Sequence, residues 1–239
     1  MKRAVRTRSW RVAPLLLIAL LFGCASDLKP GQTKDDPQVK LAKLLDEWRK
    51  VRDGGGTCAS GGRRYPYIDC GRIQAGIERL VLEFPTHPEV LLVNAVVAFQ
   101  TAQPDKAESY LDDLLEQEPR ESGAVVLRSR LAIQKGNLPR ARRLLDQQIL
   151  LRPDAADVRE AMASVHYLER DFDLAWRELA IAERLGAPTW RIAFNRGLLE
   201  EAEGRIEAAI SHFRITVEEN PEYEPARSRL LGLESERGL

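Results

Sequence analysis

A repeating pattern with a period of about 34 residues, the spacing of a helix–turn–helix repeat, constrains the fold of this chain more than any other feature. The pattern runs from about residue 88 to residue 221 and places residues of similar size at equivalent positions of four successive units. Small residues recur at Ala95, Ser129, Ala163 and Gly197, alanine recurs at Ala107, Ala141, Ala175 and Ala209, and large apolar residues recur at Leu111, Leu145, Leu179 and Phe213. This period is typical of stacked helix pairs, in which a unit buries an apolar face that it cannot bury alone.

The spacing within each unit has a physical reason. The alanine of each unit comes twelve positions after the small residue, so two helices can cross where neither side chain is bulky. Proline ends three of the units, at Pro119, Pro153 and Pro221. The third unit has Ala187 at this position and Pro188 next to it, while Gly136 and Gly204 occupy equivalent turns between two helices. Because proline cannot extend a helix, these positions separate one predicted pair from the next.

The sequence resembles the tetratricopeptide repeat family, with the best match at Gly204–Phe213 (GRIEAAISHF) followed by Asn220-Pro221. The resemblance implies an all-α fold, a right-handed superhelix of antiparallel helix pairs. We expect one irregular pair over residues 38–87, four regular repeats over residues 88–221 and a capping helix over residues 222–239. The irregular pair would begin with a helix over residues 39–52, whose leucines and Trp48 fall on one face.

Residues 1–23 have the layout of an export signal. Five basic residues and no acidic ones precede an unbroken apolar run over residues 12–22 (VAPLLLIALLF), which is too short to be a permanent membrane anchor by itself. The run ends in Gly23-Cys24, an arrangement that resembles the bacterial lipobox, in which the cysteine is acylated and becomes the mature N-terminus. A plain secretory signal and an uncleaved anchor are the alternatives. We expect cleavage before Cys24 and a covalent lipid on it as the only cofactor.

The lipid would attach the mature protein to a membrane without a spanning helix, because two or more acyl chains give stable anchoring. Residues 24–37 contain prolines and a glycine but no periodic apolar positions, so we expect a lipidated flexible linker. In lipoproteins of Gram-negative envelopes, an aspartate after the cysteine favours retention in the inner membrane. This chain has Ala25 there, so we expect the outer membrane, on its periplasmic face.

Cys58 and Cys70 form an even pair in an oxidising compartment once Cys24 carries lipid. We expect a disulfide that closes a loop of eleven intervening residues inside the irregular pair. A metal site lacks further ligands nearby, since the next histidine, His87, has no partner pair. A reactive thiol pair is the remaining alternative, although the spacing differs from the Cys-x-x-Cys arrangement of redox sites.

The charge of the chain excludes several classes of partner. The sequence has 36 basic and 36 acidic residues, and removal of residues 1–23 leaves 31 basic residues against 36 acidic ones. A net negative mature domain argues against nucleic acid, whose phosphates need an excess of lysine and arginine. The histidines lie far apart in the sequence, and no arrangement typical of catalysis or of metal binding emerges. We therefore expect neither an enzyme nor a small-molecule substrate.

The family resemblance implies a concave surface, lined by the first helix of each pair, that binds a peptide or a helix of a partner. The residues at these positions are Leu92, Val96, Phe99, Gln100, Val126, Arg130, Ile133, Gln134, Glu160, Tyr167, Phe194 and Leu198, with Ser164 among them. This mainly apolar set suits an amphipathic helix or a hydrophobic segment. Only Arg130 and the glutamines could replace the lysine and asparagine with which chaperone-binding relatives hold a carboxylate. Some of these side chains could instead pack against neighbouring repeats, and the polar pair Arg159 and Glu160 could be a contact point or an irregular interface.

These features together indicate a lipid-anchored adaptor that binds another envelope protein. The layout is similar to that of pilotin-type tetratricopeptide repeat lipoproteins, which help secretin subunits of type IV pili to assemble. Lipoproteins that assist outer-membrane barrel assembly and adaptors of cell-wall synthesis share this layout and are the alternatives. A thiol-redox factor built on Cys58 and Cys70 is the alternative of a different class.

The role of Cys24 can be tested by substitution. We predict that Cys24→Ala releases the protein from the membrane fraction and removes the mass of the acyl groups, because only this residue carries the lipid. Fractionation of cells and mass spectrometry of the intact protein measure both effects. A Cys24→Ala protein that stays membrane-bound at unchanged mass would contradict anchoring through this cysteine.

Overall fold

The computed structural model describes residues 35–53 and 70–236. These residues form eleven α-helices and no strand. The helices are α1 (Pro37–Asp53), α2 (Cys70–Glu83), α3 (Pro88–Gln100), α4 (Pro104–Gln117), α5 (Ser122–Gln134), α6 (Leu138–Leu151), α7 (Ala156–Leu168), α8 (Phe172–Arg184), α9 (Thr189–Ala202), α10 (Ile206–Glu219) and α11 (Glu224–Glu236). The chain is therefore all-α in its described part, as the sequence predicts. The segments 1–34 and 54–69, with Cys24 and Cys58, lie outside the described residues.

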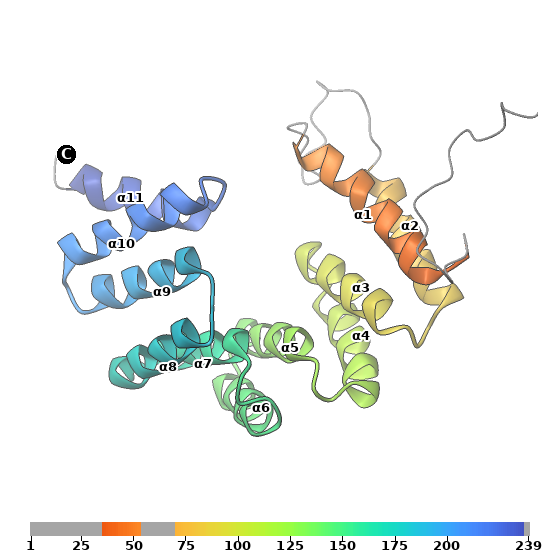
Figure 1. Ribbon diagram of the computed structural model, residues 1–239, viewed down its shortest axis with the longest axis horizontal. Coiled ribbons are helices and arrows are strands. Elements are labelled where there is room, and N and C mark those ends of the chain that lie inside the picture. The colour runs from red at the N-terminus through yellow and green to blue at the C-terminus, as the bar shows by residue number, and fades with distance from the viewer. Residues whose placement is uncertain (1–34, 54–69, 237–239) are drawn as a thin grey trace, which may run out of the picture.

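The helices form antiparallel pairs that follow one another along an arc (Figure 1). The four repeats are α3–α4, α5–α6, α7–α8 and α9–α10, with α1–α2 before them and α11 after them. The first helices of neighbouring repeats contact one another, α3 with α5, α5 with α7 and α7 with α9. These first helices thus form one continuous layer of the superhelix. None of the helices in the described part of the chain has the length and apolar character needed to cross a membrane.

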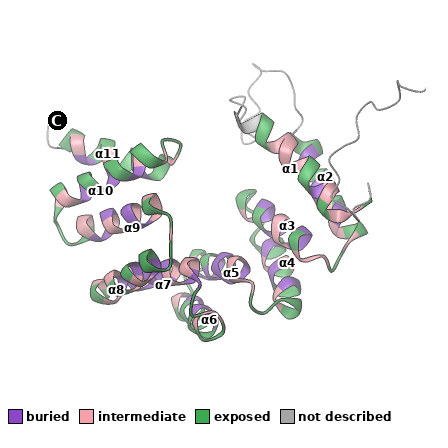
Figure 2. Ribbon diagram, viewed as in Figure 1, coloured by how far each residue is buried: buried purple, intermediate pink, exposed green. Residues whose placement is uncertain are grey.

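The repeating positions of the sequence are the core of the structure. The alanines of the second helices and the large residues one turn later are fully buried, with 0% exposure at Ala107, Ala141, Ala175, Ala209, Leu111, Leu145, Leu179 and Phe213. The small residues of the first helices are also buried. Buried residues lie between helices and exposed ones on the outer sides (Figure 2). Each pair is therefore held by an apolar contact that the next pair extends.

One position of the repeat needs a left-handed backbone. Gly136 and Gly204, in the turns between paired helices, have φ of 73° and 78°. The equivalent residues of the other two repeats, Ala102 and Arg170, have φ of 55° and 63°. Only glycine adopts this region without cost, because a Cβ crowds the following carbonyl. The tight turn is therefore a property of the repeat, and the packing of the two helices imposes it even where the sequence lacks glycine.

Polar groups link three of the four repeats to the helix before them. Asn94 of α3 donates to the carbonyl oxygen of Ile77, 3.0 Å away on α2. At the equivalent position of α5, the buried guanidinium of Arg128 donates to Asp112 over 2.8 Å and also pairs with Glu108. Arg196 of α9 pairs with Glu183 of α8 at 2.6 Å, although this pair is partly exposed. A buried charge that loses its partner is costly, so these contacts help to set how successive pairs align.

Two helices cross closely in the fourth repeat. A Cβ on Gly197 of α9 would lie 2.6 Å from Cε1 of Phe213 on α10, closer than carbon atoms can approach without movement. We predict that Gly197→Ala lowers the free energy of unfolding by about 1–3 kcal/mol, because the ring and helix must move apart. Urea unfolding followed by circular dichroism measures the change.

Gly232 of α11 offers a matched control, because a Cβ there meets nothing within 4 Å. Gly232→Ala is expected to stabilise the protein by about 0.5–1 kcal/mol, since alanine is the better helix former. Adding Phe213→Leu to Gly197→Ala should make room at the crossing, so that the two substitutions together cost less than the sum of their separate effects. Equal effects of alanine at both glycines would contradict the close crossing.

Candidate functional site

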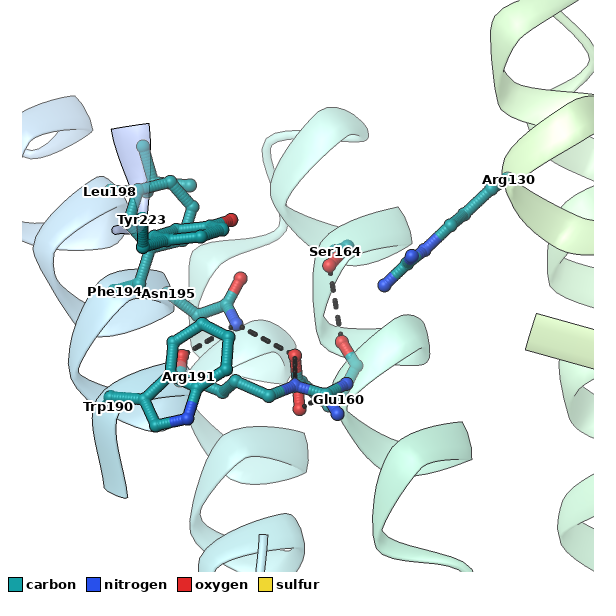
Figure 3. Close-up of a pocket in the computed structure, with 9 residues that line it drawn as sticks. All are labelled: Arg130, Glu160, Ser164, Trp190, Arg191, Phe194, Asn195, Leu198 and Tyr223. Carbon is teal, nitrogen blue, oxygen red and sulfur yellow. Dashed lines mark hydrogen bonds and ion pairs between the residues drawn. The ribbon is translucent and has the colours of Figure 1, made fainter. Parts of the chain in front are cut away.

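An open cavity of about 470 Å³ lies on the layer of first helices. Its lining comes from α5, α7, α9 and the turn before α11 (Figure 3). The lining residues are Arg130 of α5, Glu160 and Ser164 of α7, Trp190, Arg191, Phe194, Asn195 and Leu198 of α9, and Tyr223 of the turn. Because three successive repeats and the last turn contribute, the cavity exists only in the assembled superhelix.

One wall of the cavity is aromatic. The ring centroid of Tyr223 lies 4.9 Å from that of Phe194, with an interplanar angle of 88°, and 5.0 Å from that of Trp190, at 57°. Phe194 also contacts Phe213 behind it, at 5.8 Å between centroids. Tilted and edge-on contacts of this kind are favourable because the positive edge of one ring meets the negative face of another. The wall is therefore anchored in the core of the fourth repeat.

The base of the cavity holds a buried carboxylate with its own partners. Oε1 of Glu160 accepts from Nε of Arg191 at 3.0 Å and from Nδ2 of Asn195 at 3.3 Å, and Oε2 lies 2.9 Å from Nη2 of Arg191. Ser164 donates to the backbone oxygen of Glu160 at 3.2 Å. The charge of Glu160 is therefore neutralised across the α7–α9 interface. Its neighbour Arg159 points elsewhere, to Glu178 of α8 at 3.0 Å, so the two residues have separate structural roles.

Two residues of the lining, on different sides of the cavity, offer hydrogen-bond donors. The guanidinium of Arg130 reaches from α5 toward the lining residues of α7 and α9 (Figure 3). Among the described residues it makes no hydrogen bond or ion pair, and the same is true of the Tyr223 hydroxyl. Burial raises the pKa of Tyr223, Arg130 and Arg191 oppose that rise, and Glu160 adds to it. The hydroxyl is therefore protonated at neutral pH and can donate.

Acidic residues near the edge of this surface are also paired. Glu201 of α9 accepts from Arg229 of α11 at 2.6 Å, and Glu200 pairs with Arg205. With Glu160 already neutralised by Arg191, the lining has one charge that no described residue balances, the positive charge of Arg130. A local excess of positive charge attracts anions even on a protein whose total charge is negative.

Of the residues that the sequence placed on the concave surface, the structure brings five together in the cavity lining: Arg130, Glu160, Ser164, Phe194 and Leu198. Val96, Gln100 and Gln134 are exposed on α3 and α5, outside the cavity lining. The remaining five pack against or belong to the cores of their repeats: Leu92, Phe99, Val126, Ile133 and Tyr167. The lining is also less apolar than the sequence suggested, because five of its nine residues are polar or charged. The role of these residues in binding stays a prediction.

Sequence reasoning missed Trp190, Arg191, Asn195 and Tyr223. The first three could have been found, because Arg191 and Asn195 lie one turn from Phe194 and Leu198 on the same face of a predicted helix, and Trp190 begins it. Tyr223 gave no such signal, since it lies in a turn and enters the cavity only through the packing of α10 and α11 against α9. Among the described residues, no group of three or more histidine, cysteine, aspartate or glutamate side chains could hold a metal ion.

Comparison with known proteins assigns the fold. The tetratricopeptide repeat family model matches residues 92–158 and 160–224, more than half of the chain. The chain therefore belongs to the tetratricopeptide repeat family. No curated protein matches its sequence.

Solved structures of low sequence identity share the fold. A tetratricopeptide repeat protein from Parabacteroides merdae has a TM-score of 0.65 at 17% identity, with 83% of this chain and 71% of that chain covered. A thermophilic tetratricopeptide repeat protein of Thermus thermophilus gives 0.65 at 20% identity, over 83% and 98% of the two chains. The human IFIT1 dimer, solved with m7Gppp-AAAA, gives 0.66 at 17% identity, over 85% of this chain and 48% of that chain.

The buried carboxylate of the cavity can be tested by its effect on stability. We predict that Glu160→Ala lowers the free energy of unfolding by about 1–3 kcal/mol, because Arg191 and Asn195 both lose their acceptor. Asp146→Ala on α6 is the matched control, since Asp146 is exposed and lies as far as 4.0 Å from its partner Arg142; its effect should stay within about 0.5 kcal/mol. Urea unfolding of both variants measures the difference, and equal effects would show that Glu160 does not hold α9 to α7.

Proposed function

We propose that this protein is a non-enzymatic adaptor, anchored by a lipid on Cys24 to the periplasmic face of a bacterial outer membrane, and that its concave surface binds a segment of another envelope protein. Tetratricopeptide repeat proteins act as scaffolds in protein–protein interactions, which supports the binding role. The observation that carries the proposal is the open cavity formed by the first helices of three successive repeats. Within the described part of the chain, Arg130 and the Tyr223 hydroxyl make no hydrogen bond, and the aromatic residues of the wall stay partly exposed.

The membrane location rests on the sequence of residues 1–26. A basic segment, an apolar run and Gly23-Cys24 occur in the order and spacing of a lipoprotein signal, and Ala25 follows the cysteine. The polar linker up to residue 37 is long enough for the repeats to stand away from the membrane surface. The disulfide between Cys58 and Cys70 is part of the same proposal, because the periplasm is an oxidising compartment.

The client that this layout favours is an outer-membrane complex such as a type IV pilus secretin, whose subunits would be held during assembly. Outer-membrane barrel assembly and cell-wall synthesis are the other processes that the layout serves. The m7Gppp-AAAA ligand of the IFIT1 structure is not carried over to this chain. The mature sequence has 31 basic against 36 acidic residues, and a polyanion such as RNA is bound by an excess of positive charge.

Site-specific crosslinking in the native envelope tests this function. We predict that a photo-crosslinking amino acid at Ser164, inside the cavity, captures an outer-membrane partner, and that mass spectrometry identifies it as a secretin subunit. The same amino acid at Leu150 is the control, because this α6 side chain is 83% exposed and lies outside the cavity. A membrane partner captured equally from both positions, or from Leu150 alone, would contradict binding at the concave surface. A barrel-assembly or cell-wall protein at Ser164 would replace the proposed client.

A further inference from the structure

The chemistry of the cavity specifies what kind of segment it can hold. The inference rests on the proposed function, because it describes the partner segment that the concave surface binds. Three observations determine it: the charges that are already neutralised, the donors that remain free, and the shape of the surface on either side of Arg130.

The charges inside the cavity leave one cation without a partner. Glu160 is neutralised by Arg191, and the two carboxylates at the edge, Glu200 and Glu201, are each paired with an arginine further along the chain. A basic segment would therefore find no free carboxylate among the lining residues, and it would be repelled by Arg130. An anionic group would be attracted, because Arg130 has no counter-charge within the described residues.

The free polar atoms of the lining also favour a ligand with a negative charge. Arg130 offers the donors of a whole guanidinium, and the Tyr223 hydroxyl is protonated and makes no other hydrogen bond in the described part of the chain. Both groups face the same space in Figure 3. A carboxylate accepts several hydrogen bonds and donates none, so it matches a guanidinium and a hydroxyl that meet from two sides.

The aromatic wall beside these donors favours a ligand that also carries an apolar side chain. Trp190, Phe194 and Tyr223 remain partly exposed although their rings contact one another. A side chain that covers them would remove apolar surface from water, which is the main source of affinity in small interfaces. The anion and this apolar side chain must belong to one ligand, because both subsites open into one cavity.

The surface continues beyond the cavity, which points to an internal segment of a chain. On the side of Arg130 away from Trp190, the first helices α3 and α5 expose Val96, Gln100 and Gln134. A peptide can therefore pass along α9, α7 and α5 without ending at Arg130. The acidic group is then an aspartate or glutamate side chain and not the carboxylate of a C-terminus.

We propose that the cavity binds an internal, extended peptide segment in which an aspartate or glutamate, held by Arg130 and the Tyr223 hydroxyl, lies a few residues from an aromatic or large aliphatic side chain that packs on Trp190 and Phe194. This differs from the amphipathic helix or hydrophobic segment that the sequence favoured, because the free cation has no role toward an apolar ligand. Arg130 selects the partner by charge, and the aromatic wall supplies apolar contact area.

A random peptide library displayed on phage, joined to the coat protein through the peptide C-terminus, tests the sequence preference. The bait is the full-length lipidated protein in detergent. The proposal predicts that enriched peptides carry an acidic residue within a few positions of an aromatic or large aliphatic residue. The acidic preference should persist with Arg143→Gln, an exposed α6 arginine outside the cavity, and disappear with Arg130→Gln. Enriched peptides without an acidic residue, or a preference that Arg130→Gln leaves intact, overturn the proposal.

The most enriched sequence, made as a labelled synthetic peptide with an amidated C-terminus, then gives affinities by fluorescence anisotropy. Arg130→Gln should raise Kd about tenfold, in the range of a charge-assisted hydrogen bond. Replacing the acidic residue of the peptide by its amide should raise Kd by a similar factor, and the two changes together should add little further, because they remove the same contact. Arg130→Lys should restore part of the affinity. If the protein and peptide changes affect Kd independently, the proposal is overturned. It is also overturned if the peptide binds tightly only when its C-terminus is a free carboxylate.

Failure of the proposed function gives a different result. If no peptide is enriched over parent phage and Ser164 captures no partner in the envelope, the concave surface is not a peptide-binding site, and both proposals fall. If Ser164 captures a partner while the enriched peptides lack acidic residues, only the acidic specificity is wrong. A labelled single-stranded RNA that binds the protein as tightly as the best peptide would assign the free arginine to phosphate and overturn the peptide proposal.

Discussion

The close crossing of two helices within each repeat is the contact on which the rest of the structure depends. A small residue of the first helix lies against the second helix, and an alanine or large apolar residue of the second helix fills the space beside it. Because the Phe213 ring occupies the space that a Cβ on Gly197 would need, the two helices of the fourth repeat can approach this closely only with glycine at this position. Side chains from both helices of the pair then form the surface against which the next pair packs. Without this contact there would be no layer of first helices and no cavity.

Charge pairing around the concave surface gives that layer its chemistry. In the described part of the chain, the carboxylates of Glu160, Glu200 and Glu201 each pair with an arginine of a neighbouring helix or turn. The pairs of Glu160 and Glu201 hold α7, α9 and α11 together and remove negative charge from the cavity at the same time. Arg130 is left with no partner among the described residues. The same interactions that stabilise the stack therefore decide which charge a partner meets.

The sequence predicted the all-α fold and the repeat because the relevant interactions are local and periodic. Leu145 and Leu179 occupy equivalent positions of successive repeats, and both are buried between helices. The burial of one could therefore be predicted from that of the other. The concave residues were harder to predict. Phe99 and Tyr167 occupy equivalent positions on first helices, yet both pack against the cores of their repeats. Position within a repeat specifies the side of a helix, but the size of the neighbouring side chains decides whether that side is covered.

The sequence by itself determined the family, the register of the helices and the residues of the core, because its fixed period repeats each contact along the chain. The prediction of a lipid on Cys24 also comes from the sequence alone, because it depends on the order of residues and not on the fold. Only the tertiary structure decided the composition of the cavity. Arg130 and Tyr223 lie in the second repeat and beyond the fourth. They meet one cavity because the superhelix curves, and the curvature is the sum of packing angles between pairs that no single repeat encodes.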